Sequence, residues 1–259
     1  MSKRPHSPSL GLARTLSKLG YCSRSKAVEL IRTGRVIVNG KAIRNPEIIV
    51  SGERDKIAVD GKAVEPGKKI YLMLNKPRGV VTTASDEKGR ETIYGLLNSG
   101  FQAANLTEEG LPWVAPVGRL DKASEGLLLL TNDSAWGARI AAPETHLHKT
   151  YHVQIASIAD ERFIQNLASG VKTKDGSVLR AKQARQLRAG QKNCWLEIVL
   201  DEGKNRQIRR MMEGLGVEVL RLIRVAIGPL QLGDLAKGQH RRLTLEEKRM
   251  LDRTLREKS

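Results

Sequence analysis

The sequence contains few of the residues that build cysteine-rich, aromatic-lined or membrane-spanning proteins. Cysteine occurs only as Cys22 and Cys194, which are too far apart for a CxxC metal site and too few for a disulfide framework. Aromatic residues make up 3% of the chain. The longest apolar run, at 127–130, is far too short to cross a bilayer, and no secretory signal opens the chain. We therefore expect a cytoplasmic protein with two free thiols.

Acidic residues are scarce relative to basic ones. The 259 residues include 45 Lys and Arg against 28 Asp and Glu, which gives a net charge of +17 and a pI of about 10.1. Such an excess is typical of proteins that bind nucleic acid, and a merely solvated basic surface is the alternative. The length suffices for two domains, and 28% charged and 40% hydrophobic residues are typical of a globular protein.

The first part of the chain predicts a small helix–helix–hairpin domain at residues 11–65, after a basic, flexible tail at 1–10. Leucines at helical spacing predict a first helix, and Ser23 is the expected N-cap of a second one. The strand candidates Val36–Val38 and Ile57–Val59 are each followed by a tight-turn pair, Asn-Gly or Asp-Gly. The pattern therefore indicates two helices followed by paired strands.

Basic residues crowd this first domain. Because the leucines turn inward, the cations must share the outer surface, where they can neutralise backbone phosphates; a solvated helix face is the alternative. The segment LARTLSKLGYCSRSKAVELIRTGRVIVNGKAI resembles the S4 RNA-binding domain, which implies docking on structured RNA. The candidate RNA contacts here are Arg14, Arg24, Lys26, Arg32 and Arg35.

Residues 69–243 show a different pattern, with short strand candidates and interspersed helices at 159–169 and 206–215. The strands and helices do not alternate strictly, so we expect an α+β fold. A charged helix is expected at 244–259, opening with a capping box at Thr244. The strand candidates lie at 70–74, 127–131, 151–155, 194–200 and 217–225.

Two segments of this second domain carry candidate site residues. In GRLDKASEGLLLLTND, Asp121 lies in a Gly-bounded loop ahead of an apolar strand, where it can serve a reaction or simply cap a turn. Glu125 follows four residues later and offers a weak alternative, a carboxylate pair for glycoside chemistry. Tyr151 opens a strand, either as a packed aromatic residue or as a ring that supports a flipped base.

A third segment, LDEGKNRQIRRM, concentrates positive charge. On a helix its arginines lie near one face by i+3 and i+4 spacing. Because crowded cations repel one another, a negative partner is expected, and RNA phosphate and the Asp121 carboxylate are both candidates. A solvated basic helix is the alternative. The cations concerned are Lys204, Arg206, Arg209 and Arg210.

Together these segments resemble the pseudouridine synthases, specifically the branch that carries an N-terminal S4 domain and modifies bacterial ribosomal RNA. The segment around Asp121 is similar to the catalytic motif of that family. KPRGVVTT at 76–83, KTY at 149–151 and the basic segment are similar to its other signatures, in the same order. The first of these is expected to shape the site rather than react. The resemblance covers residues 12–235 and implies a mixed, mainly antiparallel sheet flanked by helices.

The resemblance also implies roles for the site residues. Asp121 is the essential carboxylate, Arg209 is its salt-bridge partner, and Tyr151 packs against the flipped uracil. Arg210 would replace Arg209 if the helix phase were shifted by one residue. Because uridine isomerisation exchanges no electrons, we expect no metal and no small-molecule cofactor. The residues implied to contact RNA in this domain are Arg119, Lys204, Arg206 and Arg210.

Several functions remain open on the sequence alone. The leading interpretation is isomerisation of a uridine in 23S ribosomal RNA. We expect the protein to be a monomer that binds ribosomal RNA or a ribosome-assembly intermediate. The same reaction on 16S RNA is the second interpretation. The S4 domain occurs in synthases that modify either ribosomal subunit, so it does not discriminate between the two targets. A non-catalytic RNA-binding or ribosome-assembly protein would need only the first domain and the basic helix. A glycosidic hydrolase using Asp121 and Glu125 is disfavoured by the few aromatic residues and the charge of +17.

Overall fold

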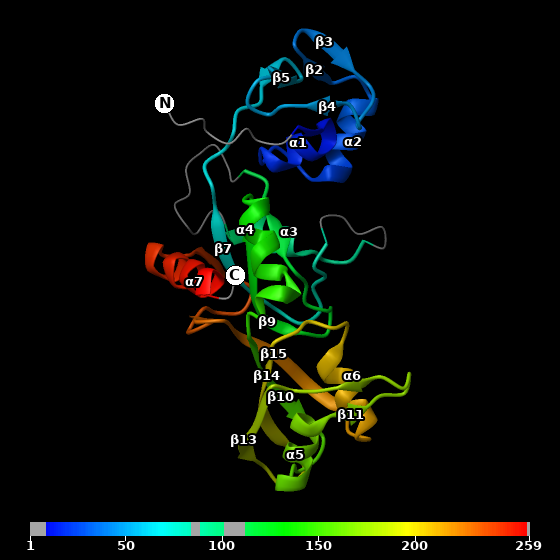
Figure 1. Ribbon diagram of the computed structural model, residues 1–259, viewed down its shortest axis with the longest axis vertical. Coiled ribbons are helices and arrows are strands. Elements are labelled where there is room, and N and C mark those ends of the chain that lie inside the picture. Colours follow the sequence, from blue (N-terminus) through cyan, green and yellow to red (C-terminus); the bar gives the residue numbers. More distant parts are fainter. Residues whose placement is uncertain (1–8, 84–88, 101–111, 258–259) are drawn as a thin grey trace. The chain divides into compact units, whose positions relative to one another are not determined.

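A computed structural model describes residues 9–83, 89–100 and 112–257 (Figure 1). Within these ranges, no helix combines the length and the apolar character needed to cross a membrane. The chain forms two compact units, each of which is described by itself below. The first comprises Met1–Tyr71, Asn105–Ala115 and Leu130–Ser134, and the second comprises Leu72–Ala104, Pro116–Leu129 and Ala135–Ser259.

The first unit contains two helices and short paired strands. Helices α1 (Leu12–Lys18) and α2 (Arg24–Arg32) share one apolar core with a four-stranded sheet of order β3-β2-β5-β6. The N-cap of α2 is Ser23, whose hydroxyl accepts a hydrogen bond from the Lys26 amide at 3.1 Å. The strands are β1 (Leu10–Gly11), β2 (Val36–Val38), β3 (Lys41–Ile43), β4 (Ile49–Val50), β5 (Ile57–Val59) and β6 (Lys62–Ala63).

A nine-stranded sheet of order β13-β14-β10-β15-β9-β7-β17 forms the framework of the second unit, with β16 and β8 paired to β15 and β9. Strand β10 runs antiparallel to both of its neighbours, whereas β15 and β9 are parallel. The sheet is therefore mixed and mainly antiparallel, as expected. Its strands are β7 (Tyr71–Lys76), β8 (Ala115–Val117), β9 (Glu125–Thr131), β10 (Lys149–Ile155), β13 (Gln183–Ala189), β14 (Cys194–Leu200), β15 (Val219–Ile227), β16 (Leu230–Gln231) and β17 (His240–Arg242).

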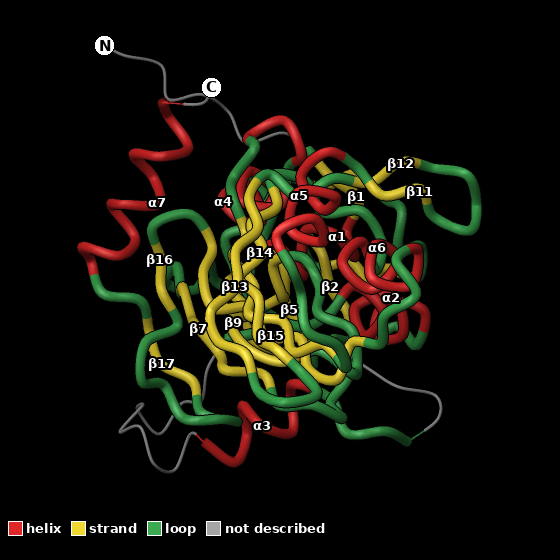
Figure 2. Tube along the Cα trace, turned by 90° about the horizontal axis from the view of Figure 1, so that it is seen from below, coloured by secondary structure: helices red, strands yellow, loops and turns green. Residues whose placement is uncertain are grey.

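Helices α5 (Glu161–Ser169) and α6 (Gln207–Gly214) cover one face of the sheet at β13, β14, β10 and β15 (Figure 1). Their apolar side chains join those of the strands in one core. Helix α7 (Leu245–Glu257) lies beside β16 (Figure 2), and Thr244 and Glu247 form the expected capping box at its start. The remaining elements are α3 (Ile93–Gly100), α4 (Ser134–Ala141), η2 (Pro143–Thr145), β11 (Val171–Lys172) and β12 (Val178–Leu179).

Candidate active site

The loop between β8 and β9 carries Asp121 and is held through its own backbone. Each main-chain carbonyl from residue 120 to residue 124 accepts a hydrogen bond. A backbone fixed in this way leaves little freedom to the carboxylate that it carries. The donors are Thr82 Oγ1 to Leu120 (2.8 Å), the Ser124 amide to Asp121 (2.9 Å), the Gly79 amide to Lys122 (2.8 Å), Arg209 to Ala123 (2.9 Å) and Lys76 Nζ to Ser124 (2.9 Å).

Lys76 ends strand β7 and places a buried ammonium group beneath this loop. Its side chain is fully buried, and its Nζ also donates to the Pro77 carbonyl at 2.9 Å. Burial lowers the pKa of Lys76 from 10.5 to about 8, while the nearby carboxylates of Glu125 and Asp121 favour its charged form. The KPRGVVTT segment therefore shapes the site through backbone contacts. Thr82, which was not predicted individually as a site residue, also donates to a carbonyl of this loop.

Gly126 fixes the start of β9 against β15. It pairs with Arg224, and a Cβ atom at Gly126 would lie only 2.3 Å from the Arg224 carbonyl oxygen. Its φ of +102° is also one that other residues rarely adopt. Only glycine permits this approach, so the glycine of the motif determines where the preceding loop lies. From the sequence, Gly126 was noted only as one residue of the GRLDKASEGLLLLTND motif.

Tyr151 lies in the same row of the sheet as Gly126. It pairs with Arg224 from the other side of β15, so two strand spacings, about 10 Å, separate its backbone from β9. The half-buried side chain packs against the core that includes Ile208 and Met211 of α6. Tyr151 therefore projects from the face of the sheet that α6 covers.

Arg206, and not Arg209, forms the ion pair with Asp121. Its Nη1 lies 3.6 Å from Asp121 Oδ2, and the two side chains are 51% and 37% exposed. Arg209 instead donates to the carbonyls of Ala123, at 2.9 Å, and Val219, at 3.4 Å. The implied pairing of Asp121 with Arg209 is thus wrong in this structure. The reason is local, because Arg206 precedes the helix with a left-handed φ of 48°, which helical spacing does not anticipate.

The guanidinium of Arg209 lies between the loop that carries Asp121 and β15. Burial lowers its pKa, and the neighbouring cations Arg206 and Arg78 act in the same direction, whereas Asp121 favours its charge. Asp121 is therefore within electrostatic reach of Arg209 although the two form no ion pair. Arg209 supports the loop and adds positive potential around the carboxylate.

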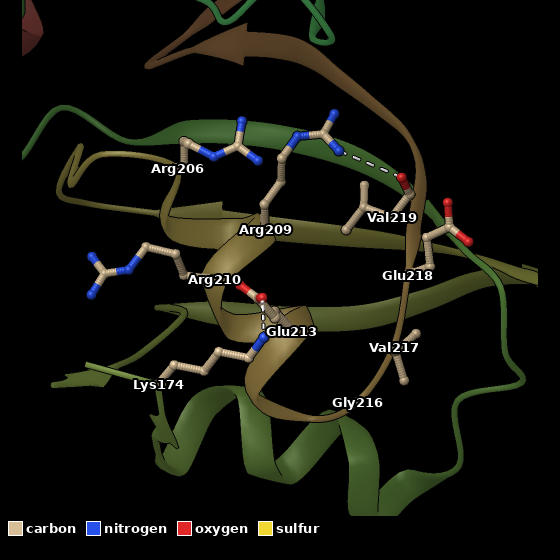
Figure 3. A pocket seen from close by; sticks show the side chains of 9 residues that line it. All are labelled: Lys174, Arg206, Arg209, Arg210, Glu213, Gly216, Val217, Glu218 and Val219. Atoms are coloured by element: carbon tan, nitrogen blue, oxygen red, sulfur yellow. Dashed lines mark hydrogen bonds and ion pairs between the residues drawn. The ribbon is translucent and has the colours of Figure 1, made fainter. Parts of the chain in front are cut away.

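Arg210 points away from this cluster, as Figure 3 shows. It donates to Asp175 at 2.5 Å and to the Ser177 hydroxyl at 2.8 Å, in the turn between β11 and β12. Hydrogen bonds from Thr173, Ser177 and Arg210 hold the pKa of Asp175 well below its usual range. Arg210 therefore anchors this turn, and the alternative helix phase that would bring it to Asp121 is not observed.

A pocket of 540 Å³ opens between α6 and the segment at 216–219 (Figure 3). Arg206 and Arg209 line it, and they are the same arginines that surround Asp121. Lys174 and Glu213 also line it and form an ion pair at 2.5 Å. The cationic side of this pocket suits a phosphate-bearing chain that passes next to Asp121.

The other residues singled out in this unit lie outside the core of the site. Arg119 is exposed two positions before Asp121, and Lys204 pairs with Glu202 at 2.9 Å. Glu125 is buried and binds Arg221 through two hydrogen bonds of 3.0 Å. Lys237 contacts the same carboxylate at 2.7 Å, so Glu125 is held in a structural network and not paired with Asp121.

The five candidate RNA contacts of the first unit fall into two groups. Lys26 pairs with Glu29 at 2.7 Å, and Arg35 binds Asp60 through two hydrogen bonds of 2.8 and 2.5 Å. The second group is exposed and makes no hydrogen bond or ion pair through its side chains with any residue that the structure describes. Its members are Arg14, Arg24 and Arg32.

Comparison with known families assigns both parts of the chain. Residues 70–214 match the family described as RNA pseudouridylate synthase, and residues 10–56 match the S4 domain. The first match contains the Asp121 loop, Tyr151 and the α6 arginines.

Individual relatives and a solved structure agree with this assignment. The chain is 34% identical over 241 residues to the ribosomal large subunit pseudouridine synthase B of Bacillus subtilis, covering 93% of this chain and 94% of the relative. It is 38% identical over 233 residues to an uncharacterized RNA pseudouridine synthase of Aquifex aeolicus, covering 90% and 89%. A crystal structure of a pseudouridylate synthase matches with a TM-score of 0.62 and 29% identity, covering 94% of this chain and 100% of the other.

Proposed function

Because the chain belongs to the RNA pseudouridylate synthase family, we propose that it isomerises a uridine of ribosomal RNA with Asp121 as the essential carboxylate. The uridine is assigned to the large subunit, in line with the name of the Bacillus subtilis relative, and a small-subunit target is the alternative. The observation that carries this proposal is a half-exposed carboxylate beside Arg206, on a loop whose five successive carbonyls all accept hydrogen bonds.

The chemistry requires a negative group at a fixed position. The bond between ribose C1′ and uracil N1 breaks, the uracil turns, and a bond from C1′ to C5 forms. The hydrogen of C5 leaves as a proton to solvent and N1 takes up a proton, so the product is an isomer of the substrate. Asp121 has to be ionised whether it attacks the sugar, attacks the base or removes a sugar proton. Arg206, Arg209 and Lys76 place positive charge around the position of that carboxylate.

The target uridine has to leave its stack to reach Asp121. Tyr151, which projects from the α6 face of the sheet, is proposed to support the extruded uracil. The exposed side chain of Arg119 is proposed to fill the vacated space or to contact the RNA backbone. Lys204 and Arg206 then contact adjacent phosphates, and the unpaired arginines of the first unit dock the enzyme on structured RNA.

Replacing the carboxylate tests the assignment directly. We expect Asp121→Asn and Asp121→Ala to abolish tritium release from ribosomal RNA labelled at uridine C5, while filter binding to the same RNA stays within about twofold of the unmodified enzyme. Asp234→Asn is a matched control, because Asp234 is an exposed carboxylate of the same unit that makes no ion pair with the described residues. Undiminished tritium release by either Asp121 variant would refute the role of Asp121.

Mapping pseudouridines in both ribosomal RNAs, from cells with and without this protein, tests the target. We expect one position of large-subunit RNA to lose its modification when the protein is absent. Loss in small-subunit RNA would support the alternative target instead. A complete absence of change, together with intact RNA binding, would favour a non-catalytic RNA-binding protein.

A further inference from the structure

The sheet of the second unit has one face that α5 and α6 cover and one that they do not. Along β14 the side chains of Cys194, Leu196 and Ile198 point into the covered core, and the alternate residues Trp195 and Glu197 are only half-buried on the other side. The open face is defined here by the side chains that share this second orientation on the paired strands. They are Arg185, Arg188, Gln154, His152, Trp195, Glu197, Arg221 and Ile223.

A line of contacts crosses the open face from the edge strand to the catalytic loop. The guanidinium carbons of Arg188 and Arg221 lie 5.2 and 5.5 Å from the centre of the Trp195 ring. Arg221 also binds Glu125, the first residue of β9, through two hydrogen bonds of 3.0 Å. Lys237 joins the same carboxylate at 2.7 Å. The cations on this line therefore outnumber the carboxylates.

Arg188 is the most informative of these cations. Its guanidinium makes no hydrogen bond or ion pair with the part of the chain that the structure describes, and its neighbour on β13, Arg185, is 67% exposed. A planar guanidinium held against an aromatic ring keeps its donors for an external acceptor. Phosphate oxygens match that fork of donors.

A hollow of 390 Å³ lies on the same face of the sheet, further along the strands. Thr150, His152 and Glu197 line one part of it, and Val225 and Leu232 line another. It thus offers both hydrogen-bonding groups and an apolar wall, as a site for an unstacked base requires. Phosphate-binding arginines and a hollow for a base are therefore found on one surface.

We propose that the open face binds the RNA chain that flanks the target uridine. Asp121 and Glu125 are four residues apart, so their backbones are separated by at most about 14 Å. An RNA strand that places a uridine at Asp121 can therefore continue round the start of β9 to Arg221, Trp195 and Arg188. The inference rests on the proposed function, because the ligand is the same RNA. It adds to the pocket beside α6 a second RNA-binding surface, on the opposite face of the sheet.

Arg188→Gln is the variant that tests this proposal, because it removes a cation that forms no hydrogen bond within the described protein. Two RNAs are compared: a short one that ends at the loop containing the target uridine, and a longer one that extends it on both sides. We expect Arg188→Gln to weaken binding of the longer RNA about tenfold. The slope of log Kd against log salt should fall by about 0.7, the value for one phosphate contact of a single strand.

Binding of the short RNA and its single-turnover rate of tritium release should be unchanged in Arg188→Gln. Arg162→Gln is the matched control, because Arg162 is an exposed arginine of α5, on the covered side of the sheet. Equal losses for both RNAs, or equal losses in Arg162→Gln, would overturn the proposal, since neither would be specific to the open face. Unchanged binding of both RNAs would also overturn it and leave the face to a protein partner. Tritium release from the short RNA distinguishes a failure of this proposal from a failure of the proposed role of Asp121.

Discussion

Replacing Gly126 by alanine should displace the catalytic loop by forcing two paired strands apart. The new Cβ would lie 2.3 Å from the carbonyl oxygen of Arg224 and 2.8 Å from its amide nitrogen. Both are backbone atoms of β15, so no side-chain rotation can relieve the clash. Overpacking of this kind costs about 1–3 kcal/mol, and the φ of +102° adds about 1–3 kcal/mol for a residue with a side chain.

Together these effects predict a loss of about 4 kcal/mol in the free energy of unfolding of Gly126→Ala, which lowers Tm by roughly 10 °C for a domain of this size. Because the loop that carries Asp121 precedes Gly126 directly, its displacement by about 1 Å should slow the chemical step by about 100-fold. Thermal unfolding followed by circular dichroism and single-turnover tritium release measure the two effects.

Gly118→Ala provides the matched control. Gly118 also has a positive φ, +71°, but a Cβ atom there would meet nothing within 4 Å. Its replacement should therefore cost only about 1 kcal/mol, from the backbone conformation alone. A Tm for Gly126→Ala within about 3 °C of that for Gly118→Ala would refute the reasoning, because the clash with β15 would then contribute nothing.

Three further predictions concern the cations around Asp121. Because the pKa of Lys76 falls from 10.5 to about 8 on folding, the unfolded chain holds a proton that the folded chain has released between these pH values. Stability relative to Lys76→Met should therefore rise from pH 8 to pH 10.5 in urea titrations, and a constant difference would contradict the lowered pKa of the buried lysine. Arg206→Gln should slow tritium release at least tenfold while changing stability by about 1 kcal/mol or less, since its ion pair is half-exposed. Arg209→Gln should reduce both the rate of tritium release and the free energy of unfolding, the latter by about 1.5–3 kcal/mol. Indistinguishable melting curves for Arg206→Gln and Arg209→Gln would contradict the different roles of the two arginines.

Elements whose signals are local were predictable from the sequence. The strand at Cys194–Leu200 and the strand at Val36–Val38 have the predicted bounds, because apolar residues and turn pairs mark them directly. The capping residues Ser23 and Thr244 also act within a single helical turn. By contrast, β13 (Gln183–Ala189) was not predicted, because its side chains are mostly exposed and polar. It becomes a strand by pairing with β14.

The candidate site shows the same division. The sequence places Asp121 in the loop before one strand, β9, and Tyr151 on a second strand, β10. The order of the sheet separates these two strands by two strand spacings. The partner of Asp121 was mispredicted, because Arg206 has a left-handed backbone before the helix begins. The bonds to the carbonyls of the loop join Thr82 and Arg209 to residues far away in sequence. No periodicity encodes such long-range contacts.

The pairing of β9 with β15 has a consequence for the order of events during translation. The Arg224 side chain donates to the Leu127 carbonyl across 97 positions of sequence, so strand β9 lacks this support until that distant segment has left the ribosome. The core of the S4 unit, in contrast, uses only residues 12–64. At a translation rate of about 5–20 residues per second, the synthesis of residue 64 and that of Arg224 are separated by roughly 8 to 30 seconds. A nascent chain can therefore hold RNA well before it is able to modify it.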